Sequence, residues 1–394
     1  TINKKTNIKT KKNVNKKISK EPKKNSFLSF IEEFTRALVI TSVIILLSIS
    51  FIIVGSGKQS NTDTNNNLIV KSYLDNLKDI ETDLSKSSRY TFVKGDICNY
   101  QLLSEVVEKY QINHIINFAA ETHVDRSIFG DCTEFVMTNT FGVLQLLNIC
   151  RNYKIEKFVN VSTDEVYGTL SFDSPEKFTE HTPIKPNMPY AAAKAGGDML
   201  CNAYFVTHKV PVVVTHCSNN YGPYQYPEKL IPSSVFRLLK NKPILIHGNG
   251  KNVRDWIHVR DHCRALYLML EKGIPGEVYN VGVDNERTNL DVAKMILRLM
   301  NLPETMIEFV EDRPGNDLRY AIDASKLMRL GWKPIYNRDQ FEVGMSETIN
   351  WYLTNRAWVE NLWSKHEDAY RINHAPTVAK KREEHKKKIL EEDI

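Results

Sequence analysis

Between residues 90 and 219, short apolar segments alternate with longer segments whose apolar residues recur at helical spacing. The short segments are apolar at consecutive rather than alternate positions, which is typical of parallel strands covered on both faces. This alternation predicts a doubly wound α/β sheet with helices on both sides. We expect strands over 90–97, 114–120, 157–163 and 210–219, and helices over 102–110, 135–153 and 190–208.

The composition excludes several other classes of protein. The chain of 394 residues is 42% hydrophobic and 25% charged, so it is neither fibrous nor disordered throughout. Its six Cys lie far apart without a Cys-x-x-Cys pair, which argues against a zinc module or a disulfide scaffold. Residues 1–36 carry a net charge of +8 within a total of +6, so the remainder sums to −2. Nucleic acid is therefore not an expected partner.

The first 67 residues lack the pattern of an enzyme domain. Residues 1–36 form a basic leader without apolar periodicity, which we expect to be disordered. Residues 37–55 are a run of 19 uncharged residues, about the length that a membrane-spanning helix needs. A transmembrane helix, with the leader in the cytoplasm, is the first interpretation, and a buried strand running into a helix is the second. Residues 56–67 read as a polar linker.

Titratable residues cluster where the predicted strands end, which is where ligands bind in parallel α/β sheets. Asp164 and Glu165 follow one strand, and two adjacent buried carboxyl groups suit a general acid and a general base. Tyr190 and Lys194 share one face of the next predicted helix, where an ammonium would lower the pKa of the phenol. A phenolate can take the proton of an alcohol while a hydride leaves its carbon. Tyr-x-x-x-Lys occurs three times in the chain, so the pair alone does not exclude chance.

Eight stretches form an ordered set from about residue 68 to 355. They are RYTFVKGDI (89–97), FAAETHVDRS (118–127), STDEVYG (162–168), PYAAAKAG (189–196), CSNNYGPYQYPEKLIP (217–232), HGNGKNVRDWIHVRDH (247–262), GEVYNVGVDNERTNLDV (276–292) and DRPGNDLRY (312–320). This set resembles the nucleotide-sugar 4,6-dehydratases of the extended short-chain dehydrogenase/reductase superfamily. The Thr-Asp-Glu triplet at 163–165 is typical of the dehydratases rather than of epimerases or decarboxylases on the same fold. The resemblance implies a Rossmann-like sheet that binds NAD, with a smaller C-terminal substrate-binding domain.

The resemblance also implies a role for five catalytic residues. Tyr190, assisted by Lys194 and Thr163, is expected to deprotonate the 4-hydroxyl of a nucleoside-diphosphate glucose while NAD+ takes the C4 hydride. Glu165 is expected to remove the C5 proton, and Asp164 to protonate the departing C6 hydroxyl. Hydride return to C6 then yields the 4-keto-6-deoxy sugar nucleotide.

Binding residues are assigned by the same resemblance. Those expected to contact NAD, besides Tyr190 and Lys194, are Asp96, Ile97, Phe118, Ala119, Ala120, Thr122, Thr138 and Asn220. Those expected to bind the nucleotide sugar, besides Thr122 and Thr163, are Asn219, Lys229, Leu230, Arg254, Asn289 and Arg313. The implied substrate is dTDP-glucose, but Asn316 stands where bacterial members commonly have His, which leaves dTDP or UDP open. His258, His262 and Cys263 are suitable zinc ligands, yet the family uses no metal there, and none is expected.

The expected domain order follows from these assignments. Residues 68–235 would form the NAD-binding domain, 236–355 mainly the sugar-nucleotide-binding domain, and 356–394 a charged tail. The resemblance implies a homodimer with its catalytic domain in the cytoplasm. A membrane anchor at 37–55 with a cytoplasmic leader would instead place that domain across the membrane.

One departure from the family concerns the N-terminal side of the sheet. Members begin with a strand and a G-x-x-G-x-x-G turn, whose backbone amides receive the NAD pyrophosphate. The chain has no such motif, so the strand and its glycine turn are expected to be missing or replaced by residues 37–55. Three interpretations remain: an active dehydratase, a membrane-tethered sugar-nucleotide-binding protein without catalysis, or a related NAD-dependent epimerase or decarboxylase.

Overall fold

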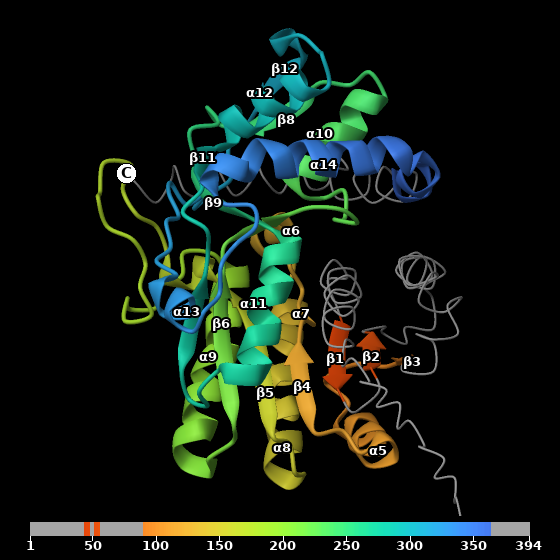
Figure 1. The fold of residues 1–394 in the computed structure, drawn as a ribbon, viewed down its shortest axis with the longest axis vertical. Helices are drawn as coiled ribbons and strands as arrows, with labels where there is room; N and C mark the ends of the chain where they lie inside the picture. Colours follow the sequence, from red (N-terminus) through yellow and green to blue (C-terminus); the bar gives the residue numbers. More distant parts are fainter. Residues whose placement is uncertain (1–42, 48–50, 56–89, 364–394) are drawn as a thin grey trace, which may run out of the picture.

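The computed structural model describes residues 43–47, 51–55 and 90–363 of the chain. Its central element is a seven-stranded sheet with the order β10-β6-β5-β4-β1-β2-β3 (Figure 1). Strands β4, β5, β6 and β10 pair in parallel, which confirms the predicted α/β fold class. The seven strands are β1 (Val43–Leu47), β2 (Phe51–Gly55), β3 (Tyr90–Lys94), β4 (His114–Asn117), β5 (Lys157–Thr163), β6 (Val212–Cys217) and β10 (Val278–Val281).

Helices cover both faces of this sheet. Successive strand residues point to opposite sides, so a strand with consecutive apolar residues must be covered on both. In β6, Val212 and Val214 belong to one hydrophobic cluster with α5, α8 and α9, whereas Val213 belongs to another cluster with α11. The consecutive apolar residues of the strand are therefore all buried. The covering helices are α5 (Tyr100–Tyr110), α8 (Val143–Asn152), α9 (Pro189–His208) and α11 (Val259–Lys272).

A smaller group of elements lies beyond the carboxyl ends of the parallel strands, at the top of Figure 1. It has its own hydrophobic core, in which Phe236, Ile296 and Tyr352 are buried. Its helices are α10 (Leu230–Leu239), α12 (Asn289–Leu299) and α14 (Phe341–Thr354), and its strands are β7 (Asn219–Tyr221), β8 (Ile244–His247), β9 (Val253–His258), β11 (Glu286–Thr288) and β12 (Ile307–Val310).

The remaining helical elements are short. They are α6 (Val124–Phe129), α7 (Thr133–Val136), the π-helix η2 (Met137–Gly142), the 3-10 helix η3 (Asp164–Tyr167), η4 (Glu304–Met306), α13 (Ser325–Arg329) and η5 (Arg338–Gln340). The chain returns from the smaller part to the large sheet through α11 and β10, which pairs with β6.

The apolar run at 37–55 contains strands rather than the predicted transmembrane helix. Its described residues form β1 and β2, which pair antiparallel with each other. Strand β1 also pairs with β4, and β2 with β3, so the segment lies between β4, which also pairs with β5, and β3, which has no other neighbour among the described residues. Ile and Val dominate both strands, and β-branched residues favour strands over helices. Among the described residues, no helix has both the length and the apolar character needed to cross a membrane.

Several sequence-based predictions lie outside the described residues. These are the disordered leader at 1–36, the polar linker at 56–67, and the charged tail from residue 364 onward. Residues 356–363, which begin the predicted tail, are helical in part and contribute Val359, Leu362 and Trp363 to the core of the smaller part.

Candidate active site

A cavity of about 640 Å³ lies between the carboxyl ends of the parallel strands and the smaller part. Fifteen of the predicted site residues line it, from segments more than a hundred residues apart in the sequence. They are Phe118, Ala120, Thr122, Thr163, Asp164, Glu165, Tyr190, Lys194, Asn219, Asn220, Lys229, Leu230, Arg254, Asn289 and Arg313. Both the predicted catalytic residues and the predicted substrate-binding residues therefore meet at one site.

Four residues predicted to contact the cofactor do not line this cavity. Ile97 and Ala119 are buried in the core beneath α8, and Ile97 lies against Gly142. Asp96 follows β3 and accepts a hydrogen bond from the backbone N–H of Cys98 at 2.8 Å. Thr138 lies on η2. Their predicted contacts with NAD stay predictions.

The carboxyl end of β5 presents the two predicted acid–base residues. Thr163 caps η3 by accepting a hydrogen bond from the backbone N–H of Glu165 at 3.3 Å. This turn directs Asp164 and Glu165 to the cavity, where Asp164 Oδ2 and Glu165 Oε2 are buried without a hydrogen-bond partner.

Neighbouring charges separate the acidities of these two buried carboxyl groups. Burial, and then the charge of Glu165, raises the pKa of Asp164 well above its usual value. Burial also raises the pKa of Glu165, but the cations Arg254 and Lys229 act against this rise. Asp164 is therefore suited to hold a proton and Glu165 to accept one.

Helix α9 supplies the predicted redox pair. It begins at Pro189, whose fixed φ suits the first helical position, so Tyr190 follows immediately at the cavity. Burial, and then the charge of Glu165, raises the pKa of Tyr190 well above its usual value, although a hydrogen bond with Thr163 lowers it. The net shift is therefore opposite to the predicted lowering, because burial and Glu165 dominate. Lys194 Nζ itself donates to the carbonyl oxygen of Val161 at 2.7 Å. Burial lowers the pKa of Lys194 itself.

Two arginines bring positive charge to the cavity from the smaller part. The buried guanidinium of Arg254 lies 4.2 Å from the ring centroid of Tyr320 and donates to the carbonyl oxygen of Asp317 at 2.9 Å. Arg313 Nε lies 2.6 Å from Asp125 Oδ1 on α6. An anionic ligand group would therefore meet both cations, with Asp125 competing for Arg313.

Sequence reasoning missed polar residues that line the same cavity. Ser218 Oγ and His262 Nε2 are buried there without a hydrogen-bond partner. Asn219 Oδ1, which belongs to a predicted substrate-binding residue, is buried in the same way. His262 Nδ1 lies 3.0 Å from Asn220 Oδ1, while His258 Nδ1 accepts from the backbone N–H of Arg260. The two histidines considered as zinc ligands are thus engaged separately, and the described residues contain no cluster of three potential metal ligands. The Ser-Asn-Asn run after β6 was the signal for Ser218.

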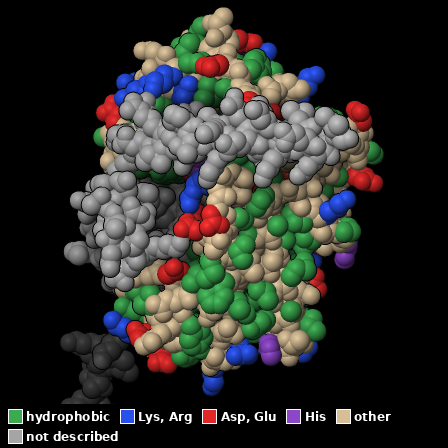
Figure 2. All heavy atoms as spheres, turned by 180° about the vertical axis from the view of Figure 1, so that it is seen from behind, with side chains coloured by type: hydrophobic (Ala, Val, Ile, Leu, Met, Phe, Trp, Pro, Cys, Tyr) green, Lys and Arg blue, Asp and Glu red, His purple; other side chains and the backbone are tan. Residues whose placement is uncertain are grey.

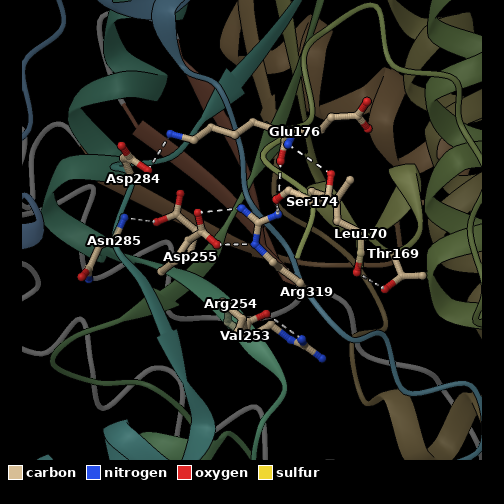
Figure 3. Close-up of polar contacts among 12 residues, drawn as sticks. Thr169, Leu170, Ser174, Glu176, Val253, Arg254, Asp255, Asp284, Asn285 and Arg319 are labelled. Atoms are coloured by element: carbon tan, nitrogen blue, oxygen red, sulfur yellow. Dashed lines mark hydrogen bonds and ion pairs between the residues drawn. The ribbon is translucent and has the colours of Figure 1, made fainter. Parts of the chain in front are cut away.

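Arg319 is a second omission, and it organises the segment between the two catalytic elements (Figure 3). This segment, residues 169–187, links η3 to α9. Arg319 makes a bidentate ion pair with Glu286, with Nε–Oε2 at 2.6 Å and Nη2–Oε1 at 3.0 Å. Its Nη1 donates to the carbonyl oxygens of Ser174 at 2.8 Å and Glu176 at 3.2 Å. The link is therefore fixed to β11 and, through a bridge between Arg319 and Val253, to β9.

The chain is similar to known nucleotide-sugar enzymes over most of its length. Residues 58–346 match the family model described as GDP-mannose 4,6 dehydratase. A dTDP-glucose 4,6-dehydratase of Xanthomonas campestris is 45% identical over 315 residues, which is 75% of this chain and 88% of that relative. One from Streptomyces niveus is 48% identical over 280 residues, covering 71% of this chain and 80% of that relative.

Solved structures agree with these relatives. The dTDP-glucose 4,6-dehydratase of Bacillus anthracis, in complex with NAD, is 42% identical with a TM-score of 0.68, covering 78% of this chain and 90% of that one. The Streptomyces venezuelae enzyme, with NAD and TYD bound, is 41% identical with a TM-score of 0.69, covering 73% and 86%. The resemblance inferred from the eight stretches is confirmed, and the chain belongs to the GDP-mannose 4,6 dehydratase family.

Proposed function

We propose that this chain is an NAD-dependent dehydratase that converts dTDP-glucose to the 4-keto-6-deoxy sugar nucleotide. The observation that carries the proposal is the meeting of Tyr190 and Lys194 with Thr163, Asp164 and Glu165 in one cavity. Transient oxidation at C4 and elimination of water need a base for the 4-hydroxyl, a base for the C5 proton and an acid for the C6 hydroxyl, and these five residues supply those groups. Dehydratase relatives at 42–48% identity favour this function over a non-catalytic binding protein, epimerase or decarboxylase.

The residues present fit NAD and a nucleotide sugar. The cavity has buried polar atoms without partners, such as Ser218 Oγ, Asn219 Oδ1 and His262 Nε2, which a polar ligand can satisfy. Phe118, Ala120, Thr122, Asn220, Tyr190 and Lys194 would hold NAD. When bound, NAD+ supplies a hydride acceptor for C4 and, once reduced, a hydride donor for C6.

Proton movements fall to the chain's own residues. Tyr190 Oη accepts the proton of the 4-hydroxyl in its phenolate form, which the hydrogen bond with Thr163 favours. The ammonium of Lys194 is proposed to favour the same form. Glu165 removes the C5 proton, which the neighbouring 4-ketone has made acidic, and Asp164 donates a proton to the departing C6 hydroxyl. The raised pKa of Asp164 supports its role as the acid, because burial keeps its proton in place.

Substrate binding is assigned to the charged side of the cavity. Arg254 and Arg313 would bind the pyrophosphate, and Lys229, whose Nζ donates to the carbonyl oxygen of Thr122 at 2.8 Å, would approach the same ligand. The other residues proposed to bind the substrate, all of which line the cavity, are Thr122, Thr163, Asn219, Leu230 and Asn289. The cytoplasmic location implied by the resemblance stays a prediction.

A homodimer is part of the proposal. Apolar side chains are exposed on α9 and on the adjacent π-helix η2, and Figure 2 shows hydrophobic side chains gathered on one face of the molecule. Met199 and Val206 lie two helical turns apart on α9, and Met137 and Phe141 lie on η2. An apolar face of this kind is typical of an interface. Light scattering of the full chain should give twice the monomer mass, and Met199→Glu should shift it to the monomer.

The test of the function is turnover of dTDP-glucose by the purified full chain with NAD+, followed through the absorbance of the 4-keto product. We expect turnover, with Glu165→Gln about 100- to 10,000-fold slower because the general base is lost. The matched control is Glu156→Gln, at a carboxyl remote from the cavity lining. A folded chain that binds NAD+ and dTDP-glucose but gives no product would refute the catalytic proposal.

A further inference from the structure

A chain of buried polar side chains lies behind the catalytic residues, and the proton steps above do not use it. Asp198 lies on α9, one helical turn after Lys194, and His216 lies on β6. His216 Nε2 is 3.2 Å from Asp198 Oδ2, and His216 Nδ1 is 2.7 Å from the hydroxyl of Tyr167 on η3. All three side chains are at most 5% exposed. His216 therefore joins the helix of the redox pair to the helix of the acid–base pair.

The direction of the hydrogen bonds on the Tyr167 side is determined by a backbone carbonyl. Asn280 Nδ2 donates to the carbonyl oxygen of Phe178 at 2.9 Å. A flipped amide would place two carbonyl oxygens against each other, so Asn280 Oδ1 must face Tyr167. The Tyr167 hydroxyl therefore donates to Asn280 Oδ1 at 2.8 Å. Its single proton is then used, so His216 Nδ1 must carry a hydrogen and donate to Tyr167.

A backbone amide determines the direction on the Asp198 side. The N–H of Ala119 donates to Asn117 Oδ1 at 3.0 Å, so Asn117 Nδ2 donates to Asn160 Oδ1 at 3.0 Å. Asn160 Nδ2 is then directed at Asp198 Oδ1, at 3.0 Å. The Ser162 hydroxyl donates to Asp198 Oδ2 at 2.6 Å. Each oxygen of the Asp198 carboxyl group thus receives a donor, which favours the ionised carboxylate, because that form can only accept hydrogen bonds.

These two constraints meet at His216. Nδ1 donates to Tyr167, and Nε2 faces a carboxylate that needs a donor, so both ring nitrogens carry hydrogen. We propose that His216 is a buried imidazolium paired with ionised Asp198, and that this pair is a positioning element that holds η3 and α9 in register. The protonation state stands on the hydrogen bonds alone, whereas the positioning role rests on the proposed dehydratase function.

The charged groups around the pair are consistent with this arrangement. On α9, the Asp198 carboxylate favours the charged form of Lys194, against burial. The charges of Glu180, Asp198 and Asp164 all raise the pKa of Tyr167, which lies on η3, in addition to the larger effect of burial. Glu180 Oε1 accepts a hydrogen bond from the backbone N–H of Asn280 at 3.0 Å. A cation at His216 offsets these negative charges in a part of the core from which water is excluded.

The protonation state is tested by NMR of the full chain carrying ¹⁵N-labelled histidine, with the His216 signals assigned from the His216→Asn variant. We expect both ring nitrogens of His216 to carry a hydrogen at neutral pH. In Tyr167→Phe, Nδ1 loses its acceptor and should lose its proton, while Nε2 keeps its own. Exposed His208 is the control, and its ring-nitrogen signals should be the same in every sample. A wild-type His216 with one bare ring nitrogen at neutral pH would overturn the proposal.

The positioning role is tested by kinetics of the same variants. Tyr167→Phe and Asp198→Asn should each lower kcat by about 10- to 100-fold, the effect of a small misplacement of catalytic groups. The KM for dTDP-glucose should change by less than about threefold, because no group assigned to bind substrate is altered. His208→Gln serves as the matched control with unchanged kcat. Folded variants with wild-type kcat would refute the positioning role. A wild type without turnover would refute the proposed function, and the protonation state of His216 would still be tested by the NMR experiment.

Discussion

Loss of the Arg319 side chain should destabilise the link between the acid–base helix η3 and the redox helix α9. The guanidinium is 9% exposed and binds both oxygens of Glu286, whose side chain is 22% exposed. It also holds the carbonyl oxygens of Ser174 and Glu176, which lie in the link at 169–187. Arg319→Ala removes all four hydrogen bonds at once and leaves the Glu286 carboxylate without this cation.

The four contacts set the size of the effect. Hydrogen bonds to charged groups contribute about 1.5–3 kcal/mol, and neutral ones about 0.5–1.5 kcal/mol. Ser174 and Glu176 are partly exposed, so water recovers much of the loss at their carbonyl oxygens. We therefore expect Arg319→Ala to lower the free energy of unfolding by about 3 kcal/mol, toward the range for a broken buried pair. Arg319→Lys keeps the charge but not the bidentate geometry, and should lose about half as much.

Urea unfolding followed by tryptophan fluorescence measures this difference, and turnover of dTDP-glucose measures its consequence for the site. Because the link positions η3 against α9, kcat of Arg319→Ala should fall about 10-fold or more while KM changes little. Lys177→Ala is the matched control, since its pairing with Asp284 at 2.7 Å is exposed and worth less than about 1 kcal/mol. Unfolding and kcat of Arg319→Ala equal to those of the control would refute the reasoning.

Three further predictions follow from the same site and its support. Asp164→Asn should abolish turnover yet stabilise the fold by about 0.5–2 kcal/mol near pH 8. Because the pKa of Asp164 is raised, the folded chain binds this proton more tightly than the unfolded chain, and the wild type loses stability as the pH rises above the ordinary Asp range. The urea midpoints of the wild type and the variant should therefore converge toward pH 4. Arg254→Lys should raise KM for dTDP-glucose about 10-fold, because a lysine lacks the fork for a pyrophosphate and the 4.2 Å stack on Tyr320, whereas an unchanged KM would remove Arg254 from the binding site. Gly197→Ala should lower the free energy of unfolding in urea by about 1–3 kcal/mol, because its new Cβ would lie 2.5 Å from the backbone oxygen of Asn139 on η2. An unaltered free energy of unfolding would show that the two helices can separate at no cost.

The sequence by itself determined the fold class and most of the candidate site. Consecutive apolar residues in strands such as Val212–Cys217 predicted a sheet covered on both faces, because that pattern has few other ways to be buried. The polar residues after each strand predicted the site, since parallel strands end at the same edge. Ordered motifs then brought Asp164, Glu165, Tyr190 and Lys194 together, and these residues do line one cavity.

Only the tertiary structure decided the points that depend on neighbours distant in sequence. A run of 19 uncharged residues has the length of a membrane span, and its β-branched composition alone left both readings open; pairing with β4 and β3 makes its described residues strands. The pKa of Tyr190 is raised rather than lowered, because burial and Glu165 outweigh a lysine that donates to Val161. The roles of Arg319 and His216 likewise come from partners scattered along the chain. Hydrogen bonds and burial depend on distances in space, and local periodicity carries no record of them.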